Sequence, residues 1–285
     1  MTTMNLIEDT IGKNEILDAV ALKPLFLEDG DPVPFKQAVV KKSTGKPIAV
    51  VGNKYELIQT EAVINAFANC IDTSALDTNG LDIKVSQSPN AVRSIVKFTF
   101  PEHSIATGKD DNTHLQISLR NSHDGSWPTQ IDVGGFRITC ANGQVVGDFI
   151  SAFRTLHTKR ASFAGIKDGL GASIHMFEEA GSRWLEYKKT KINEEQGQDI
   201  VLDYLGKVYE TEEDKWTALD RVSSRRDTMF EKFGGYSKEM GRNVLAAYNT
   251  LTDDATHGSE DAMVQFDRSK RAAKVIESHF ELIAA

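Results

Sequence analysis

The sequence predicts an α+β fold, in which an N-terminal helix and an antiparallel β-meander precede a helical C-terminal portion. Two patterns support this prediction. Between residues 82 and 119 apolar and polar residues alternate, as they do in strands that are buried on one face. After residue 160 apolar residues recur at helical spacing, with capping signals beside them. We expect an irregular lead-in over 1–34, an α+β core domain over 35–160 and a helical region over 161–285.

A hairpin and a helix are expected at the start of the core domain. Residues 35–41 and 47–52 are β-prone runs, and Ser, Thr and Gly at 43–45 supply a turn between them. Thr60 is a suitable N-cap for a helix over residues 61 to about 71, where apolar residues recur on one face. The irregular lead-in before the hairpin is predicted from its Pro and Asp-Gly content.

Alternating runs predict the strands of the meander. They occupy residues 82–88, 92–100 and 115–119, and strand character resumes at 130–133 and 136–140. Residues 103–113 include Gly108 and several charges, which predicts a flexible connection. Gly134 and Gly135 predict a bulge or bend, and Asn142–Gly143 predicts a tight turn.

The helical region contains recognisable starts and stops. Capping signals occur at Asn193, Thr211 and Ser259, and Gln196 completes a capping box with the first of these. Helices are expected over residues 215–233, 241–251 and 262–283. The pair Gly234–Gly235 is predicted to end the first of them.

Composition limits the compartment and the class of protein. The 285 residues carry a net charge of −8, with 40% hydrophobic and 26% charged residues, which is ordinary for a soluble globular protein. Apolar runs are far shorter than a membrane span, and the N-terminus has no secretory pattern. Cys70 and Cys140 form no Cys-x-x-Cys pair. We expect a cytoplasmic protein with reduced thiols and no membrane partner.

Several common enzyme signatures are missing. Residues 42–47, KSTGKP, look superficially like a phosphate-binding loop, but the leading Gly is absent and Pro follows Gly-Lys. Residues 165–171 lack the dinucleotide-binding glycine pattern, and no Gly-x-Ser-x-Gly elbow occurs. The sequence therefore predicts no ATPase, dehydrogenase or hydrolase of the common types, and no organic cofactor.

The segment NSHDGSW at residues 121–127 has two interpretations. Asp124 beside His123 is able to orient the imidazole as a general base or a metal ligand. Asn, Ser, Asp and Gly also favour a turn, because their side chains bond to nearby backbone groups. A metal-binding alternative adds two more histidines, although none of the four residues has a known metal-ligand spacing. That set, for a divalent ion, is His114, His123, Asp124 and His157.

Positive charge gathers late in the core domain. Between residues 137 and 160 four basic residues accompany one acid. We expect these four to contact nucleic-acid phosphates and Trp127 to stack on a base, with Phe149 and Phe153 as a core stripe. The four basic residues are Arg137, Arg154, Lys159 and Arg160. A further group, Arg221, Arg225 and Arg226, is interpreted as a solvated helix face that pairs with Asp220, Asp227 and Glu231.

Several short segments occur together in an order known from one family. They are YELIQ at 55–59, NSHDGS at 121–126, RITCANG at 137–143, LHT at 156–158 and AYNTLTDDATHG at 247–258. In this combination the chain resembles the phage- and plasmid-borne domain-of-unknown-function family 932. Many relatives have Thr where this chain has Gly143, so their hydroxyl is absent here. The resemblance implies a viral or other mobile-element setting and no established chemistry.

The order of a helix before a β-meander is similar to single-strand annealing recombinases, which line a basic groove and form rings. We therefore expect a non-catalytic protein that binds or anneals single-stranded DNA in recombination or replication, and that self-associates. One alternative is a metal-dependent enzyme acting on nucleotides or nucleic acid. Another is an inhibitor that binds a host defence protein, which the acidic C-terminal half would suit.

Overall fold

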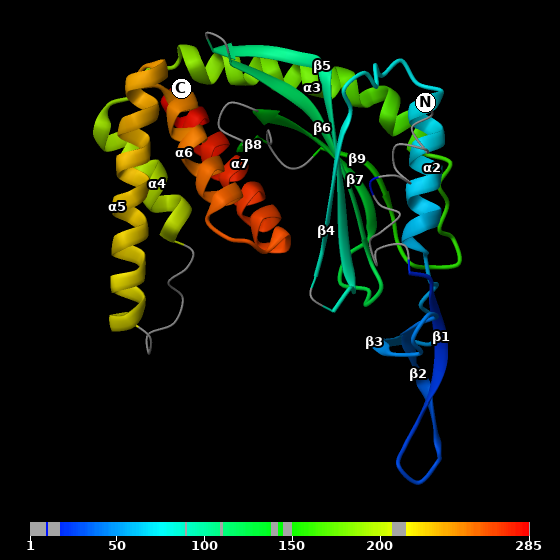
Figure 1. Cartoon of the computed structure of the whole chain (residues 1–285). Coiled ribbons are helices and arrows are strands. Elements are labelled where there is room, and N and C mark those ends of the chain that lie inside the picture. Colours follow the sequence, from blue (N-terminus) through cyan, green and yellow to red (C-terminus); the bar gives the residue numbers. More distant parts are fainter. Residues whose placement is uncertain are drawn as a thin grey trace. The chain divides into compact units, whose positions relative to one another are not determined.

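The computed structural model describes residues 10, 18–88, 90–108, 111–137, 142–144, 150–206 and 215–284. It contains two antiparallel sheets and a helical C-terminal part, which confirms the α+β prediction (Figure 1). The chain forms two compact units. Unit 1 comprises Met1–His103, Leu115–Val133 and Ser151–His175, and unit 2 comprises Ser104–His114, Gly134–Ile150 and Met176–Ala285. The units therefore interleave along the chain.

A small sheet begins the described chain, with strand order β1-β2-β3. The predicted hairpin is confirmed as β2 and β3, but β1 and the start of β2 occupy part of the lead-in that was predicted to be irregular. Pro24 lies in β1, at the edge of the sheet, where a missing N–H is tolerated. Val20, Val39 and Val51 form the core of this sheet. The three strands are β1 (Val20–Phe26), β2 (Pro32–Lys41) and β3 (Pro47–Gly52).

The large sheet has the order β4-β5-β6-β7-β8, and β9 also pairs with β7. Helix α2 (Thr60–Asp72) packs on it, with the ring centroids of Phe67 and Phe98 4.8 Å apart. The apolar positions that predicted α2 and the alternating strands are therefore the ones that form this core. The strands are β4 (Asp82–Gln87), β5 (Arg93–Gly108), β6 (Asp111–Ser122), β7 (Thr129–Arg137), β8 (Asn142–Gln144) and β9 (Ile150–Thr155).

Strands β5 and β6 are longer than the sequence predicts. The flexible connection expected at 103–113 is wrong, because β5 continues to Gly108 and β6 starts at Asp111. Ile105 packs so closely on α3 that a Cβ added at Gly181 would lie 2.1 Å from its Cδ1 atom. Packing against a helix thus orders strand ends whose local sequence is polar.

The glycine pair in β7 serves a close approach between elements. Gly134 and Gly135 lie within one continuous strand instead of forming the expected bend. A Cβ at Gly135 would lie 2.4 Å from the indole of Trp184 and 2.5 Å from Cγ2 of Thr113. The tight turn expected at Asn142–Gly143 is also wrong, because these residues belong to β8 and pair with β7.

Five helices follow the large sheet in the described chain. In unit 2, α6 packs against α4, α5 and α7, and Figure 1 shows these four side by side. No helix in the described residues is long and apolar enough to cross a membrane. The helices are α3 (Ile166–Lys189), α4 (Glu194–Gly206), α5 (Lys215–Met240), α6 (Val244–His257) and α7 (Ala262–Ala284).

Helix boundaries confirm some capping signals and correct others. The Asn193–Gln196 capping box is formed, with reciprocal bonds of 2.9 and 2.8 Å between side chains and backbone N–H groups. Helix α5 does not end at Gly234–Gly235 but continues to Met240. Buried Phe233 and Tyr236 on either side of the pair anchor the helix there, which offsets the low helix propensity of glycine. The cap expected at Thr211 lies outside the described residues.

Candidate functional site

Three segments that the sequence singles out meet in unit 1. Tyr55 follows β3, His123 follows β6 and His157 follows β9. The ring of Tyr55 stacks on the imidazole of His157, with centroids 4.8 Å apart and planes 10° apart. The Tyr55 hydroxyl donates a 3.0 Å hydrogen bond to the carbonyl oxygen of Ser122. We call Tyr55, His123, Asp124 and His157 the Tyr–His corner.

Buried hydrogen bonds hold the corner to the start of α2. The Asn121 amide donates to the carbonyl of Ile58 at 3.2 Å and to the hydroxyl of Thr60 at 3.0 Å, and it accepts from Thr129 at 2.7 Å. The Thr60 hydroxyl also lies 3.3 Å from Nε2 of His123. Thr60 was predicted to cap α2, but its side chain serves the corner. The N-cap position belongs to Gln59 and has no side-chain cap bond.

Both histidines of the corner are neutral at pH 7. Their side chains are buried, with His123 6% and His157 8% exposed. Burial, and then the charge of His157, lowers the pKa of His123 to about 4, while Asp124 opposes the shift. Burial also lowers the pKa of His157, against the opposing effects of the Glu56 backbone and Asp124. Both imidazoles are therefore available as neutral donors and acceptors.

Unused hydrogen-bonding capacity remains in this corner. Within the described part of the chain, Nδ1 of His123 and both ring nitrogens of His157 have no hydrogen-bond partner. Burying such groups without a partner costs free energy, so buried polar atoms of this kind commonly mark a functional position. Burial, followed by the charge of Asp124, also raises the pKa of Tyr55 above its ordinary value, which keeps the phenol protonated.

The His-Asp segment forms a turn, as one of its two interpretations predicted. Oδ1 of Asp124 accepts a 2.9 Å hydrogen bond from the Ser126 N–H, and Gly125 has a φ of +75°. Burial acts to raise the pKa of Asp124, but hydrogen bonds from Ser126 and Ser122 and the charge of Arg93 hold it below its usual value. Asp124 thus remains a carboxylate that shapes the turn.

The four residues of the metal-binding alternative are divided between the units. His123, Asp124 and His157 belong to unit 1, while His114 belongs to unit 2. Across the described residues, no group of three or more His, Cys, Asp and Glu side chains is placed to hold a metal ion.

A cavity of about 360 Å³ opens where the segment after β9 meets the start of α2. The Glu56 N–H donates a 3.1 Å hydrogen bond to the His157 carbonyl oxygen, and this bond joins the two walls of the cavity. The lining combines an ammonium group, a carboxylate, a hydroxyl, an amide and an aromatic ring. Its residues are Glu56, Leu57, Ile58, Gln59, Ala62, Thr158, Lys159, Ala161 and Phe163.

The predicted phosphate-contacting residues are partly gathered here. Lys159 lines the cavity and is exposed, and Arg160 beside it is also exposed. Arg154 is exposed on β9, three residues before His157. Arg137 ends β7, and its side chain lies outside what the structure describes. Three of the four predicted cations are therefore accessible within one short segment.

Trp127 is half-buried and already contacts two cations. Its ring centroid lies 5.5 Å from the guanidinium carbon of Arg93 and 5.4 Å from that of Arg120. Arg120 in turn forms a buried 2.7 Å ion pair with Asp132 of β7. The Trp127 backbone N–H donates to the hydroxyl of Ser122. Trp127 therefore helps to hold the turn, and the area left for stacking a base is reduced.

Several residues of this region were not predicted to have a role. Phe163 lines the cavity, although no repeating pattern surrounds it in the sequence. Arg93 contributes a guanidinium that is 39% exposed and lies 3.6 Å from Asp124. A signal for Tyr55 existed, because it begins the quoted YELIQ segment, but its stacking on His157 depends on a contact between distant segments.

The second basic group of the sequence, Arg221, Arg225 and Arg226, is only partly a solvated face. Arg226 pairs at 2.7 Å with Asp227, one of the acids that were predicted to pair with this group. Arg225 instead binds Asp254 of α6. The side chain of Arg221 lies outside what the structure describes.

Comparison with known proteins gives one match. Residues 47–278 match the family model described as Domain of unknown function (DUF932). Neither the curated proteins nor the solved structures contain a match to the chain. The similarity to annealing recombinases therefore gains no support from solved structures.

Proposed function

The chain belongs to the family described as Domain of unknown function (DUF932), and because this description assigns no activity, we propose from the site itself that the protein binds single-stranded DNA without catalysing a reaction. The cavity beside the Tyr–His corner is the observation that best supports the proposal. It places the ammonium of Lys159, the hydroxyl of Thr158 and the ring of Phe163 around one space.

These groups suit two parts of a nucleotide, the phosphate and the base. Lys159 and Thr158 are suited to a backbone phosphate, and contacts of that kind fix position without identifying the base. Phe163 offers a ring for base stacking, and Leu57 and Ile58 add apolar surface. Arg154 and Arg160 add accessible positive charge on the same segment. We assign the stacking role to Phe163 in preference to Trp127, whose ring already contacts two guanidinium groups.

We further propose that the protein self-associates when it acts in recombination or replication. Large apolar side chains are exposed on the small sheet, among them Phe26 at 59%, Phe35 at 65% and Val50 at 55%. We take these exposed side chains as surface that a second copy of the chain covers. Light scattering with and without single-stranded DNA measures this association directly, and a monomer under both conditions would contradict it.

Fluorescence anisotropy with a labelled oligonucleotide at low salt tests DNA binding. We expect the double variant Lys159→Gln/Arg160→Gln to bind about tenfold more weakly or worse, because charge-assisted contacts to phosphates are lost. The matched control is Lys42→Gln/Lys46→Gln, which removes the same charge from the exposed turn between β2 and β3. The control should bind like the natural protein. Absence of micromolar binding by the natural protein, or equal weakening by both variants, would refute the proposal.

A further inference from the structure

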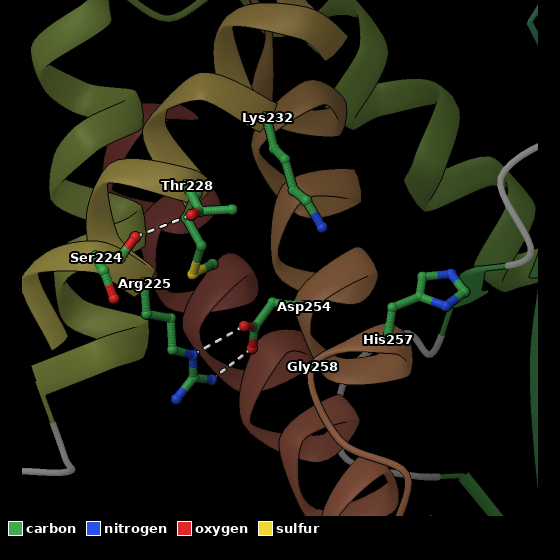
Figure 2. Close-up of a pocket in the computed structure, with 8 residues that line it drawn as sticks. Ser224, Arg225, Thr228, Lys232, Asp254, His257 and Gly258 are labelled. Carbon is green, nitrogen blue, oxygen red and sulfur yellow. Dashed lines mark hydrogen bonds and ion pairs between the residues drawn. The ribbon is translucent and has the colours of Figure 1, made fainter. Parts of the chain in front are cut away.

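A second pocket, of about 250 Å³, lies in unit 2 between α5 and the C-terminal end of α6 (Figure 2). The proposed DNA binding uses none of its residues. Cationic and hydroxyl side chains make up half of its lining residues. The lining residues are Ser224, Arg225, Thr228, Met229, Lys232, Asp254, His257 and Gly258.

Asp254 is the centre of an ion-pair network beside this pocket. Nε of Arg225 donates to Oδ1 at 2.8 Å, and Nη2 of the same guanidinium binds Oδ2. The Tyr204 hydroxyl donates to Oδ2 at 2.8 Å, and Nη1 of Arg268 lies 3.9 Å from that oxygen. One carboxylate is thus shared by two guanidinium groups and a phenol.

A third cation of this region, Lys232, is partly neutralised by the neighbouring Asp253. Lys232 donates from Nζ to Oδ1 at 2.6 Å, and Tyr236 donates to Oδ2 at 2.9 Å. The three cations Arg225, Lys232 and Arg268 therefore stand against two carboxylates, which leaves one positive charge. An excess charge of this kind attracts an anion.

One unused donor lies beside the pocket, although its residue, Arg268, is not part of the lining. Within the described chain, Nη1 of Arg268 is buried and has no hydrogen-bond partner. Gly258 allows this approach, because a Cβ there would lie 2.5 Å from the same Nη1 atom. Figure 2 shows the Lys232 side chain extending from α5 into the space that Asp254 and His257 border. Guanidinium, ammonium and imidazole groups therefore border one hollow.

We propose that this pocket binds the phosphoryl group of a small phosphorylated ligand. Arginine and lysine together supply forked and single-point donors, which is the usual chemistry of phosphate recognition. The volume is slightly below the range of about 300 Å³ and upward that encloses drug-sized ligands, so a phosphoryl group with little attached to it is favoured. Free phosphate, a mononucleotide or the 5′-phosphate of an oligonucleotide each provides this group.

Isothermal titration of the full chain with inorganic phosphate, a 5′-mononucleotide and a 5′-phosphorylated oligonucleotide tests the proposal. Lys232→Gln should weaken binding about tenfold or more, because one charge-assisted contact is lost. Arg226→Gln is the matched control, since it removes one charge from the same helix outside the pocket lining and should bind as tightly as the natural chain. Lys232→Arg restores the charge and should recover most of the binding.

The three ligands distinguish the source of the phosphoryl group. Inorganic phosphate binding as tightly as the others would identify the free anion, while tighter mononucleotide binding would identify a nucleotide. Stronger binding of a 5′-phosphorylated than of a 5′-hydroxyl oligonucleotide would identify a DNA end. The Lys159→Gln/Arg160→Gln variant should bind phosphate as tightly as the natural chain. This pocket can therefore be confirmed even if the DNA-binding proposal fails. No saturable binding of any ligand, or equal binding by Lys232→Gln in its folded state, would overturn the inference.

Discussion

At the scale of single residues, the corner depends on two imidazoles that are buried in their neutral form. His123 is close to the hydroxyl of Thr60, and His157 lies flat against Tyr55. A proton added to either ring would place a positive charge in a buried site, beside a second imidazole that is also buried. The folded state therefore binds these protons more weakly than the unfolded chain does.

This difference predicts a loss of stability in acid. An unfolded histidine has a pKa of about 6.5, whereas that of folded His123 is about 4. The stabilisation is therefore complete above the unfolded pKa and is lost as the pH falls from there through the folded pKa, by about 3 kcal/mol for this residue. Urea unfolding across this pH range measures it. His123→Gln should flatten the pH dependence, and the exposed control His175→Gln should not.

The chemical character of the corner was predictable from residue types, but its contacts were not. His123, Asp124 and His157 were recognised as candidates, and the turn formers around Asp124 predicted the turn that is found. The stacking of Tyr55 on His157 joins positions about a hundred residues apart, which no local pattern encodes. For the same reason the pairing of Arg120 with Asp132 and its contact with Trp127 follow only from strand register.

At the scale of elements, α3 approaches β9 closely through one glycine. A Cβ at Gly169 would lie 2.1 Å from the carbonyl oxygen of Ala152, whereas a Cβ at Gly171 of the same helix would meet nothing within 4 Å. The absence of a side chain at Gly169 thus allows the backbone of α3 to lie directly against the strand. Helical spacing predicts that a helix is present, but not how near its backbone comes to a strand.

Two alanine substitutions test this approach. Gly169→Ala should destabilise the protein by at least about 2 kcal/mol, because backbone atoms must move apart. Gly171→Ala, the matched control, should stabilise it by up to about 1 kcal/mol, since alanine favours the helix and space is available. Chemical denaturation of both variants gives the two free energies of unfolding. Equal effects at both positions would contradict the close contact.

Tertiary packing also explains which elements the sequence pattern missed. The strand ends at 103–108 and 111–113 are polar and glycine-containing, yet they are extended because α3 lies against Ile105. Helix α5 continues through Gly234–Gly235 because its neighbouring apolar side chains are buried. Periodic segments with strong local signals were predicted well, including α2, β4 and the Asn193 capping box. Segments whose local preference opposes their packing were not.

At the scale of the whole molecule, a net charge of −8 opposes any contact with DNA away from a local cationic site. Lys159, Arg160 and Arg154 provide such a site on one segment. The attraction for DNA therefore comes from these few residues and not from the net charge of the protein. Because salt screens charges, both the attraction to this segment and the repulsion elsewhere weaken as the salt concentration rises.

The salt dependence of binding provides the corresponding prediction. Each phosphate contact on a single strand contributes about 0.7 to the slope of log affinity against log salt, so Lys159→Gln/Arg160→Gln should lower that slope by about 1.4. Phe163→Leu is the control, because it removes a stacking ring and no charge. It should weaken binding about tenfold with an unchanged slope. Anisotropy titrations over a series of salt concentrations separate the two effects.

Helix α2 extends from the cavity into the core of the large sheet. Gln59 and Ala62 at its start line the cavity, while Phe67 farther along packs on Phe98. DNA bound in the cavity therefore restrains the same helix that packs on the sheet. The backbone amides in the first turns of α2 should then exchange hydrogen with solvent more slowly. Hydrogen exchange at one helix would then report ligand occupancy without any label on the DNA.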